Sequence, residues 1–358
     1  MIKTLVIIPT YNEKENIKNI LTAIDKLSRN DTEILVVDDS SPDGTAEIVK
    51  NVIPKLKTPI HLLVRKNKNG LGKAYVEGFK WALKGDYDFV ISMDADFSHD
   101  PQDLPKLIDA SKEYDIVIGS RYIKGGKIIG WDIKRQLNSR LANLFTRIAL
   151  GLKAKDVTAG FKRYKTSFLE ELNLDSLISS GYAFQVEMVF RSKAAPKQIL
   201  EVPITFVDRR VGQSKIAGEL KKSAVIVWRL FIRRTGVRQF MKFAIVGFGN
   251  FLFDTAIYFV ETRFLNVGVI IAKTISFVAS ATSSYYFNRK WTFRSNQKNI
   301  TRQYLKFIFI SGIGLAINVS SFYLFHKTLG IYDLISLVFA TAITTFWNFT
   351  ANKKWTFK

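Results

Sequence analysis

Two carboxylates one residue apart follow an apolar run that is typical of a buried strand. The run 89–93 ends at Asp94, and Asp96 comes two positions later. In a strand, residues i and i+2 point to the same side. At the carboxyl end of a strand in an open α/β sheet, both side chains would face the crevice where such sheets bind ligands. Two hard oxygen donors in that place suit a divalent cation that also holds a diphosphate, although an isolated Asp-x-Asp triplet also fits a solvated turn.

Acidic side chains follow two earlier apolar runs as well. Glu13 comes after the run 5–8, and Asp38 and Asp39 come directly after 34–37. Taken singly, each cluster fits turn or helix-cap chemistry. The expected strands are 5–8, 34–37, 61–65, 89–93 and 116–119, with helical patterns between them from 17, from 45 and over 73–83. This alternation predicts an α/β fold with a mainly parallel, Rossmann-like sheet whose strand ends meet at one edge, so we expect one site.

Two common nucleotide-binding patterns are missing from this part of the sequence. No Gly-x-Gly-x-x-Gly follows the first strand, and no Walker Lys-Ser/Thr pair is present. Both omissions disfavour a dinucleotide-dependent dehydrogenase and a P-loop enzyme.

The charge and the apolar residues indicate a membrane protein. A formal net charge of +22 suggests nucleic acid, an anionic membrane surface or phosphorylated ligands as partners. Four apolar stretches, each close to the roughly 20 residues that span a bilayer as a helix, follow in the last third of the chain. They are 242–261, 267–287, 305–325 and 334–351. Since the basic residues accompany these stretches, we expect membrane lipids and no nucleic acid as partners.

Loop charges predict the orientation of the four spans. The connection between spans two and three is strongly basic, whereas the connection between spans one and two carries only Arg263. The positive-inside rule places the basic connection in the cytoplasm. We therefore expect an integral protein of the cell membrane, with the amino-terminal domain and the carboxyl terminus both cytoplasmic.

The membrane region contains an internal repeat. The segment 288–294, NRKWTFR, returns as 352–358, NKKWTFK, at an offset of 64 residues. This repeat predicts two helical hairpins, each with a basic and aromatic anchor at the interface. Asp254 and Lys273 fall inside spans one and two, where they either form a buried ion pair or help to move a substrate.

Two further segments combine basic and apolar residues at helical spacing. They cover 131–151 and 218–238, and both are typical of amphipathic helices that lie in the headgroup layer or pack on the domain surface. The expected organisation is a catalytic domain over 1–217, an interface helix or linker over 218–238, and a membrane domain over 239–358.

Several motifs resemble those of a known enzyme family. The segments 8–13 (IPTYNE), 37–44 (VDDSSPDG) and 93–99 (MDADFSH) resemble family 2 glycosyltransferases with a GT-A fold. Four more segments are similar to dolichyl-phosphate mannose synthases: 119–122 (GSRY), 158–161 (TAGF), 181–188 (GYAFQVEM) and 202–215 (VPITFVDRRVGQSK). The resemblance covers about 4–220, and the four spans resemble the GtrA-like domain that is fused to some synthases of this type.

The resemblance implies roles for the matching residues. Those expected to bind the guanosine of GDP-mannose are Pro9, Tyr11, Glu13, Val37 and Asp39. Those expected at the diphosphate are Asp94, Ala95 and Asp96, with Asp96 as the principal ligand of Mg²⁺ or Mn²⁺. Ser98 stands where some relatives have a Gln that completes the metal shell, so the shorter side chain would act through water. Those expected at phosphate groups or the sugar are Arg121, Arg209 and Lys215, and those at the lipid phosphate are Arg135 and Ser139.

The implied reaction is inverting transfer of mannose from GDP-mannose to dolichyl or polyprenyl phosphate. The acceptor phosphate is already ionised, so no general base is needed, and Arg121, Arg135 and Arg209 would hold it in line. A UDP-glucose or other UDP-sugar transferase would share the scaffold. A flippase or transporter of lipid-linked sugar, with the soluble domain as a donor-binding module, is the alternative from another class. A processive polysaccharide synthase is disfavoured because its Gln-x-x-Arg-Trp motif is missing.

Overall fold

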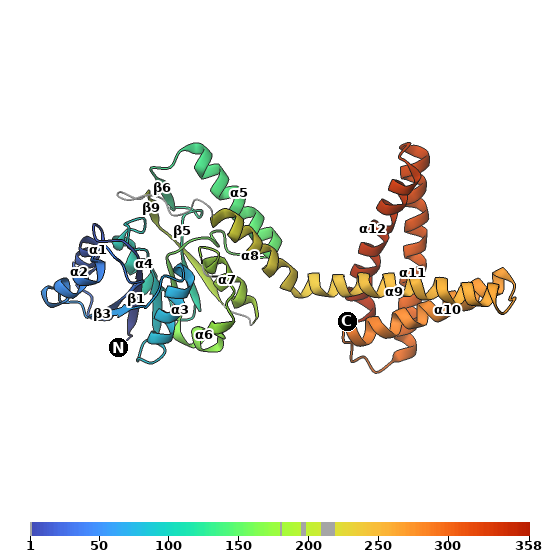
Figure 1. Cartoon of the computed structure of the whole chain (residues 1–358), viewed down its shortest axis with the longest axis horizontal. Helices are drawn as coiled ribbons and strands as arrows, with labels where there is room; N and C mark the ends of the chain where they lie inside the picture. Colours follow the sequence, from blue (N-terminus) through green and yellow to red (C-terminus); the bar gives the residue numbers. More distant parts are fainter. Residues whose placement is uncertain (1, 180, 195–197, 209–218) are drawn as a thin grey trace. The chain divides into compact units, whose positions relative to one another are not determined.

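The computed structural model describes residues 2–179, 181–194, 198–208 and 219–358 of the chain. The chain divides into two compact units, Met1–Phe231 and Ile232–Lys358 (Figure 1). Each unit is described by itself below.

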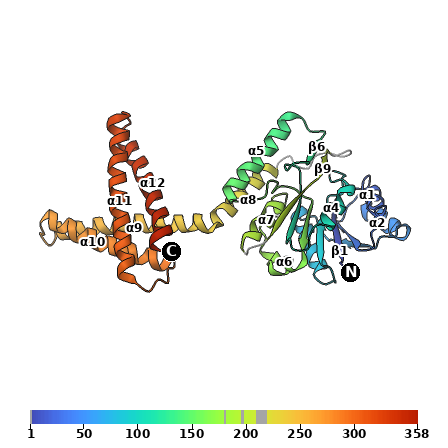
Figure 2. The ribbon, with the colours of Figure 1, turned by 180° about the vertical axis from the view of Figure 1, so that it is seen from behind.

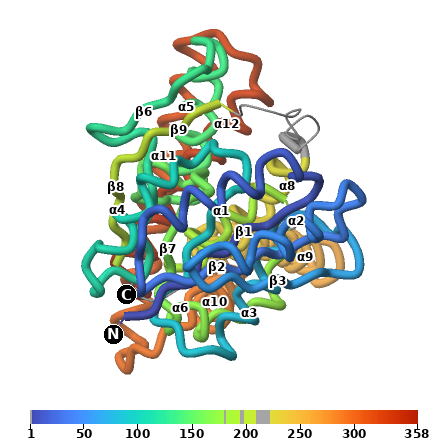
Figure 3. The backbone as a smooth tube through the Cα atoms, turned by 90° about the vertical axis from the view of Figure 1, so that its left-hand side faces the viewer, coloured from blue at the N-terminus to red at the C-terminus, as the bar shows by residue number. Residues whose placement is uncertain are grey.

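The first unit is built on a seven-stranded sheet with the order β3-β2-β1-β4-β7-β5-β8. Only β7 runs antiparallel to its neighbours, so the sheet is mostly parallel and Rossmann-like, as the sequence predicts. Figure 3 shows β1, β2 and β3 side by side. The strands are β1 (Thr4–Thr10), β2 (Thr32–Asp38), β3 (Ile60–Val64), β4 (Phe89–Ser92), β5 (Ile116–Ser120), β7 (Lys162–Lys165) and β8 (Ile199–Pro203). A separate parallel pair consists of β6 (Lys127–Ile129) and β9 (Thr205–Val207).

Both faces of the sheet are buried along the inner strands β1, β4 and β5, which explains why these strands are largely apolar. Leu5 and Ile7 of β1 belong to one core cluster, while Val6 and Ile8 belong to the other, as the two-residue period of a strand requires. The helices of this unit are α1 (Ile17–Asp25), α2 (Thr45–Val52), α3 (Leu71–Ala82), α4 (Leu104–Ile108), α5 (Ile133–Leu150), α6 (Thr166–Glu171), α7 (Phe184–Arg191) and α8 (Glu219–Arg233).

The second unit consists of two helical hairpins (Figures 1 and 2). The first hairpin is α9 (Thr235–Arg263) with α10 (Val269–Phe287), and the second is α11 (Ile300–Tyr323) with α12 (Asp333–Ala351). Three helical stretches of the described residues are long and apolar enough to cross a membrane: Thr235–Arg263, Ile300–Thr328 and Asp333–Thr356. The fourth expected span, 267–287, forms α10 but does not reach that apolar composition, because it carries Lys273 and several hydroxyl side chains.

The internal repeat is visible in the structure of both hairpins. The two copies of the repeated segment form π-helical turns, Asn288–Thr292 and Asn352–Thr356. In the first copy the Lys242 ammonium lies 4.9 Å from the Trp291 ring centre, and in the second Lys306 lies 5.0 Å from Trp355. Each lysine also donates to the backbone carbonyl of its tryptophan, at 3.3 and 3.5 Å. Both hairpins therefore end in the same basic and aromatic turn, and its role as an anchor at the membrane interface stays a prediction.

The connection between the two units differs from the expected boundaries. The amphipathic segment predicted over 218–238 is helical, but α8 ends at Arg233 and α9 begins at Thr235. Arg234 between them has an extended backbone conformation, which interrupts the helix. The helix that contains the first expected span therefore starts at Thr235, before residue 242.

The other amphipathic segment, expected over 131–151, is helix α5. It ends at Gly151, which has a left-handed backbone conformation.

Candidate active site

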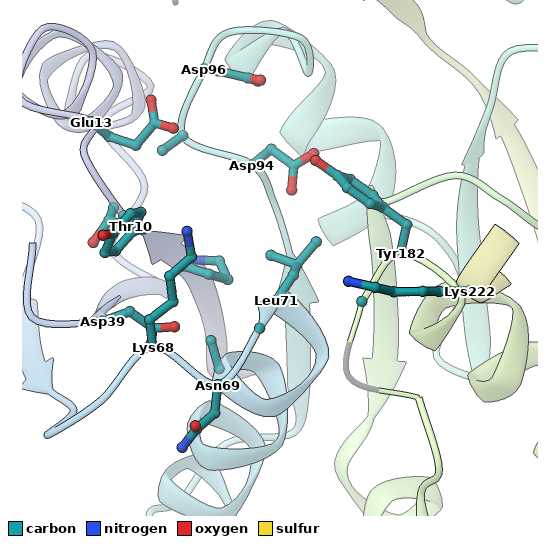
Figure 4. A pocket seen from close by; sticks show the side chains of 16 residues that line it. Thr10, Glu13, Asp39, Lys68, Asn69, Leu71, Asp94, Asp96, Tyr182 and Lys222 are labelled. Atoms are coloured by element: carbon teal, nitrogen blue, oxygen red, sulfur yellow. The ribbon is translucent and has the colours of Figure 1, made fainter. Parts of the chain in front are cut away.

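The carboxyl ends of β1, β2 and β4 meet at one pocket of about 580 Å³. Figure 4 shows carboxylates from all three strand ends around it. Seven of the residues expected to bind the donor line this pocket: Pro9, Tyr11, Glu13, Asp39, Asp94, Ala95 and Asp96. The others that line it are Thr10, Lys68, Asn69, Gly70, Leu71, Ala74, Gly181, Tyr182 and Lys222. Residues from all three acidic clusters thus line the same pocket.

The two adjacent acids after β2 have different environments. Asp38 is fully buried and accepts hydrogen bonds from Thr10 Oγ1 at 2.8 Å and from the Ser41 hydroxyl at 2.6 Å, which fixes the turn. Asp39 lines the pocket and pairs with Arg65, with 2.5 Å between Nη1 and Oδ1. Burial raises the pKa of Asp39, against the lowering effect of the Arg65 charge. Asp39 is thus held in place by Arg65 and faces the pocket.

A segment after β3 supplies pocket residues that the sequence reasoning missed. Lys68 places its ammonium 3.7 Å from the ring centre of Tyr11, a cation–π contact. A backbone hydrogen bond from Asn69 also reaches Asp39. The same strand-end rule that identified the acidic clusters applies to β3, but the segment carries no carboxylate to draw attention to it.

Hydrogen bonds within the Asp-x-Asp turn hold the Asp96 carboxylate in position. Asp96 Oδ1 accepts hydrogen bonds from the Ser98 backbone amide at 3.1 Å and from its hydroxyl at 2.6 Å. Phe97 between them adopts a left-handed backbone conformation with φ of 61°. Such strain in a non-glycine residue tends to occur at functional sites. Ser98 therefore orients the Asp96 carboxylate directly.

The first acid of this turn is positioned from two sides. Asp94 Oδ1 accepts a hydrogen bond from the buried Tyr75 hydroxyl at 3.3 Å, and the Tyr75 ring stacks on Phe184. The Asp94 backbone amide donates to His99 Nδ1 at 3.1 Å. Burial lowers the pKa of His99, opposed by the charges of the neighbouring carboxylates. A neutral His99 whose Nδ1 accepts this bond is a structural residue rather than a general base.

Arg121, expected at a phosphate, is enclosed. Its Nε and Nη2 lie 2.8 and 2.9 Å from the two carboxylate oxygens of Asp156, and its side chain is 8 % exposed. Aromatic rings surround the guanidinium, with centres 5.1 Å away for Tyr122 and 5.2 Å for Phe206. Arg121 does not line the pocket that the structure describes.

The residues expected at the lipid phosphate lie near Arg121. Arg135 stacks over Trp131 at 4.4 Å and pairs with Asp208 at 2.7 Å. The Ser139 and Tyr122 hydroxyl groups are 2.7 Å apart. Arg121, Arg135 and Ser139 therefore gather around the side chains of Trp131 and Tyr122. We call this group the α5 cluster: Arg121, Tyr122, Trp131, Arg135, Ser139 and Asp208.

Strand β9 joins the α5 cluster to the Asp-x-Asp turn. The Val207 amide donates to the Ser98 carbonyl at 3.1 Å, and Phe206 forms an isolated bridge with His99. The Phe206 ring in turn lies 5.3 Å from that of Trp131. β9 thus contacts both the Asp-x-Asp turn, about a hundred residues earlier in the sequence, and the α5 cluster.

The remaining expected residues are placed as follows. Val37 is fully buried in β2 and does not line the pocket. Arg209 and Lys215 lie outside the described residues. Within the described ranges, no three His, Cys, Asp or Glu side chains come together as a possible metal site.

The comparisons with known proteins agree with this architecture. Residues 5–172 match the model of glycosyl transferase family 2, and residues 242–357 match the GtrA/DPMS transmembrane domain. An undecaprenyl-phosphate mannosyltransferase of Micrococcus luteus is 43 % identical over 239 residues, which are 66 % of this chain and 98 % of the relative. A polyprenol monophosphomannose synthase of Mycolicibacterium smegmatis is 40 % identical over 224 residues, 62 % of this chain and 84 % of the relative.

Among solved structures, glucosyl-3-phosphoglycerate synthase from Mycobacterium tuberculosis is 17 % identical, with a TM-score of 0.49 over 65 % of this chain and 79 % of that one. The family models and the curated relatives confirm the glycosyltransferase and the membrane domain that the sequence predicts. The chain belongs to glycosyl transferase family 2, as a member that carries a GtrA/DPMS transmembrane domain.

Proposed function

We propose that this glycosyltransferase moves mannose from GDP-mannose to the phosphate of a membrane polyprenol, dolichyl or another polyprenyl phosphate, with inversion at the anomeric carbon. The observation that carries the proposal is the joining of the pocket to the α5 cluster through β9, in a chain 43 % identical to a polyprenyl-phosphate mannosyltransferase. The pocket would hold the donor, and the α5 cluster would hold the acceptor.

The donor nucleoside fits the end of the pocket nearest β1 and β2. Tyr11 offers an aromatic face, already stacked against a lysine, and Asp39 offers carboxylate oxygens that suit base or ribose donors. Glu13 is buried there, with one oxygen accepting from Asn16 at 2.8 Å. The carboxylate oxygens accept hydrogen bonds from a base or ribose, and the aromatic ring can stack on a base. This combination suits an uncharged nucleoside.

The diphosphate would lie beside Asp94 and Asp96 together with Mg²⁺ or Mn²⁺. Both acids line the pocket and both offer hard oxygen atoms, which these cations prefer. Since the described residues contain no third acidic ligand here, diphosphate oxygens and water would complete the coordination. The bound cation would supply charge neutralisation for the departing nucleoside diphosphate. The protein's own part is to fix both carboxylates, through Tyr75 and Ser98.

The acceptor phosphate would bind in the α5 cluster. Arg135 can pair bidentately with a phosphate, and Ser139 can donate a hydrogen bond. The phosphate is ionised near neutral pH, so positioning replaces proton removal. Arg209 and Lys215, which lie beyond the described end of β9, remain part of the proposed phosphate-binding set.

Helix α5 would bring the acceptor to this cluster from the bilayer. Its apolar residues recur at three- and four-residue spacing and stay exposed on the first unit: Ile133, Leu137, Leu141, Leu144 and Ile148. Each is between 46 and 84 % exposed, which is unusual for a surface in contact with water only. A helix of this kind suits the headgroup layer, where the phosphate of a polyprenol lies.

The membrane domain would place the site at the cytoplasmic face. We propose four spans, α9 to α12, with the catalytic domain and the carboxyl terminus in the cytoplasm. The two repeat anchors support this orientation, because both end their hairpins on the side that carries the basic loop.

A transfer assay with purified full-length protein in detergent tests the proposal. It offers dolichyl phosphate and Mn²⁺ with radiolabelled GDP-mannose, UDP-glucose or UDP-GlcNAc, each with and without EDTA. We expect label in the lipid fraction from GDP-mannose only, and none after EDTA. Transfer from a UDP-sugar would replace the proposed donor, and donor binding without any transfer would favour a flippase or transporter with a donor-binding module.

A further inference from the structure

One wall of the donor pocket comes from the helix that leads into the membrane domain. Lys222 of α8 lines the pocket together with Gly181 and Tyr182. Figure 4 shows Lys222 and Tyr182 on the same side of the pocket. All other lining residues come from the segments up to residue 182. α8 ends at Arg233, and the membrane-spanning candidate α9 begins at Thr235. A helix that is separated from the first membrane-spanning candidate by a single residue, Arg234, thus contributes to the donor site.

The charged side chains that line the pocket indicate which part of the donor Lys222 would contact. Four carboxylates line the described pocket, from Glu13, Asp39, Asp94 and Asp96, against two ammonium groups. One of these, Lys68, stacks on Tyr11 beside β1. Figure 4 shows the other, Lys222, entering from the opposite side, beyond Leu71. A nucleoside diphosphate sugar is an anion, so an ammonium group on that side would stabilise its charged end in addition to the metal ion.

The inner face of α8 fixes the position of Lys222. Val227 and Leu230 are buried in the core cluster that also contains Tyr75 and Phe184. Tyr75 is the residue whose hydroxyl contacts Asp94. The packing that seats α8 therefore belongs to the same cluster that positions the first acid of the Asp-x-Asp turn.

The outer face of α8 is apolar as well. Val225 is 50 % exposed and Trp228 61 % exposed, and the Trp228 ring stacks on Phe231. Lys222, Arg229 and Arg233 recur at i, i+7 and i+11, which places them on one stripe beside this apolar face. An apolar face bordered by arginines, on the helix that precedes a membrane-spanning candidate in the chain, fits a lipid surface.

We propose that Lys222 is a donor-binding residue that contacts the diphosphate–sugar end of the nucleotide, and that seating of α8 on the bilayer sets donor affinity through it. This inference rests on the proposed function for the identity of the donor. It adds a residue to the donor site and a coupling between the membrane and that site. If Lys222 were an ordinary solvated surface lysine, its substitution would not change donor affinity, and contact of α8 with lipid would not act on the donor site through it.

The first experiment measures donor binding and steady-state kinetics of the full-length protein in nanodiscs that contain anionic lipid. Lys222→Ala is compared with Lys222→Arg and with Lys84→Ala, which removes an exposed lysine outside both the pocket and α8. We expect Lys222→Ala to weaken donor binding about 10-fold, or about 1.4 kcal/mol, because a charge-assisted hydrogen bond to the diphosphate is lost. The acceptor KM should change less than about 2-fold. Lys222→Arg should restore most of the donor affinity, and Lys84→Ala should leave the donor affinity unchanged.

Calorimetry with the GDP–Mn²⁺ complex, in the absence of acceptor, separates this inference from the proposed function. If wild-type protein binds a UDP-sugar instead, the same variants are compared with that nucleotide, because the diphosphate is common to both. Equal donor affinity of wild type and Lys222→Ala would overturn the role of Lys222. An equal loss in Lys222→Arg together with a lowered unfolding temperature would also overturn it, by indicating a structural role.

The coupling to the membrane has its own test. Trp228→Glu places a charge on the outer face of α8, away from the pocket. We expect it to weaken donor binding in nanodiscs several-fold, and to add little to the effect of Lys222→Ala in the double variant. Unchanged donor affinity in Trp228→Glu, or strictly additive losses in the double variant, would overturn the coupling while leaving Lys222 as a donor contact.

Discussion

The Arg121 guanidinium forms a bidentate ion pair with Asp156, and both side chains are nearly inaccessible to solvent. Burial alone would raise the pKa of Asp156, but the Arg121 charge and its hydrogen bonds outweigh burial and hold that pKa below its usual range. Arg121 also donates to Thr158 Oγ1 at 2.9 Å. The residue predicted to bind phosphate is therefore held by the loop before β7, while its guanidinium also contacts the Tyr122 and Trp131 rings within the α5 cluster.

This pair gives a stability prediction. Asp156→Ala would leave a buried guanidinium unpaired, so we expect the free energy of unfolding of the first unit to fall by about 3–5 kcal/mol. Chemical denaturation of the full-length protein in detergent, followed by tryptophan fluorescence, measures it. The matched control is Asp175→Ala, which removes an exposed partner of Lys80 and should cost little. A similar small effect for both variants would contradict the structural role of the buried pair.

The Asp-x-Asp turn gives a prediction on catalysis. Asp96→Ala should lower kcat at least about 100-fold, because the departing diphosphate loses its charge stabilisation, while the unfolding temperature stays near that of wild type. Ser98→Ala removes only the hydroxyl bond to Asp96 and should have a smaller effect. Asp88→Asn, an exposed acid just before β4, serves as the control. Near-normal turnover of Asp96→Ala in the transfer assay would exclude the proposed role of this turn.

The ion pair between Arg135 and Asp208 predicts opposite effects of two substitutions. Arg135→Ala should raise the KM for polyprenyl phosphate about 10-fold and leave the donor KM nearly unchanged. Asp208→Asn should lower the acceptor KM, because the carboxylate no longer competes with phosphate for the guanidinium. Lys134→Ala, an exposed neighbour on α5, is the control. Parallel changes of both KM values in Arg135→Ala would place this residue outside the acceptor site.

Glu33, at the amino end of the sheet, predicts a loss of stability in acid. Burial by itself raises its pKa, but hydrogen bonds from Tyr87, His61 and Lys3 outweigh burial and lower the pKa to about 2. Because the folded pKa lies below the ordinary value of 4.5, the stabilisation is complete above pH 4.5 and disappears as the pH falls toward 2. Thermal unfolding between pH 6 and 2.5 should show a weaker pH dependence in Glu33→Gln. Glu170→Gln on the surface should behave as wild type.

The two hairpins allow one copy to serve as the control for the other. In the first hairpin Lys273 pairs with Asp254 at 2.5 Å, and Ser276 donates to the same carboxylate at 2.8 Å. At the offset of 64, Asn318 and Leu337 occupy the equivalent positions in the second hairpin. The double substitution Asp254→Asn with Lys273→Leu should therefore keep the hairpin folded, whereas Lys273→Leu alone leaves a charge without its partner.

Thermal stability in detergent, measured for both variants, decides this point. A double variant that stays folded but no longer transfers the sugar would assign a functional role to the ion pair. Equal destabilisation by the single and the double change would contradict the comparison between repeats.

The sequence by itself determined the main architecture and much of the site. Apolar runs that alternate with helical patterns predict a parallel sheet, and the strand-end rule places Glu13, Asp39 and Asp94 at one edge of it. The repeat and the apolar stretches likewise predict the two membrane hairpins. These features depend on periodicity and chain order, which the amino-acid sequence states directly.

Only the tertiary structure decided which side chains are available for binding. Asp38 and Asp39 look alike in the sequence, yet one is buried in a turn and the other faces the pocket. Arg121 is held by Asp156, 35 residues away, and Lys222 enters the pocket from a helix 126 positions beyond Asp96. Such pairings arise from long-range packing, so no local pattern of charge or hydrophobicity can reveal them.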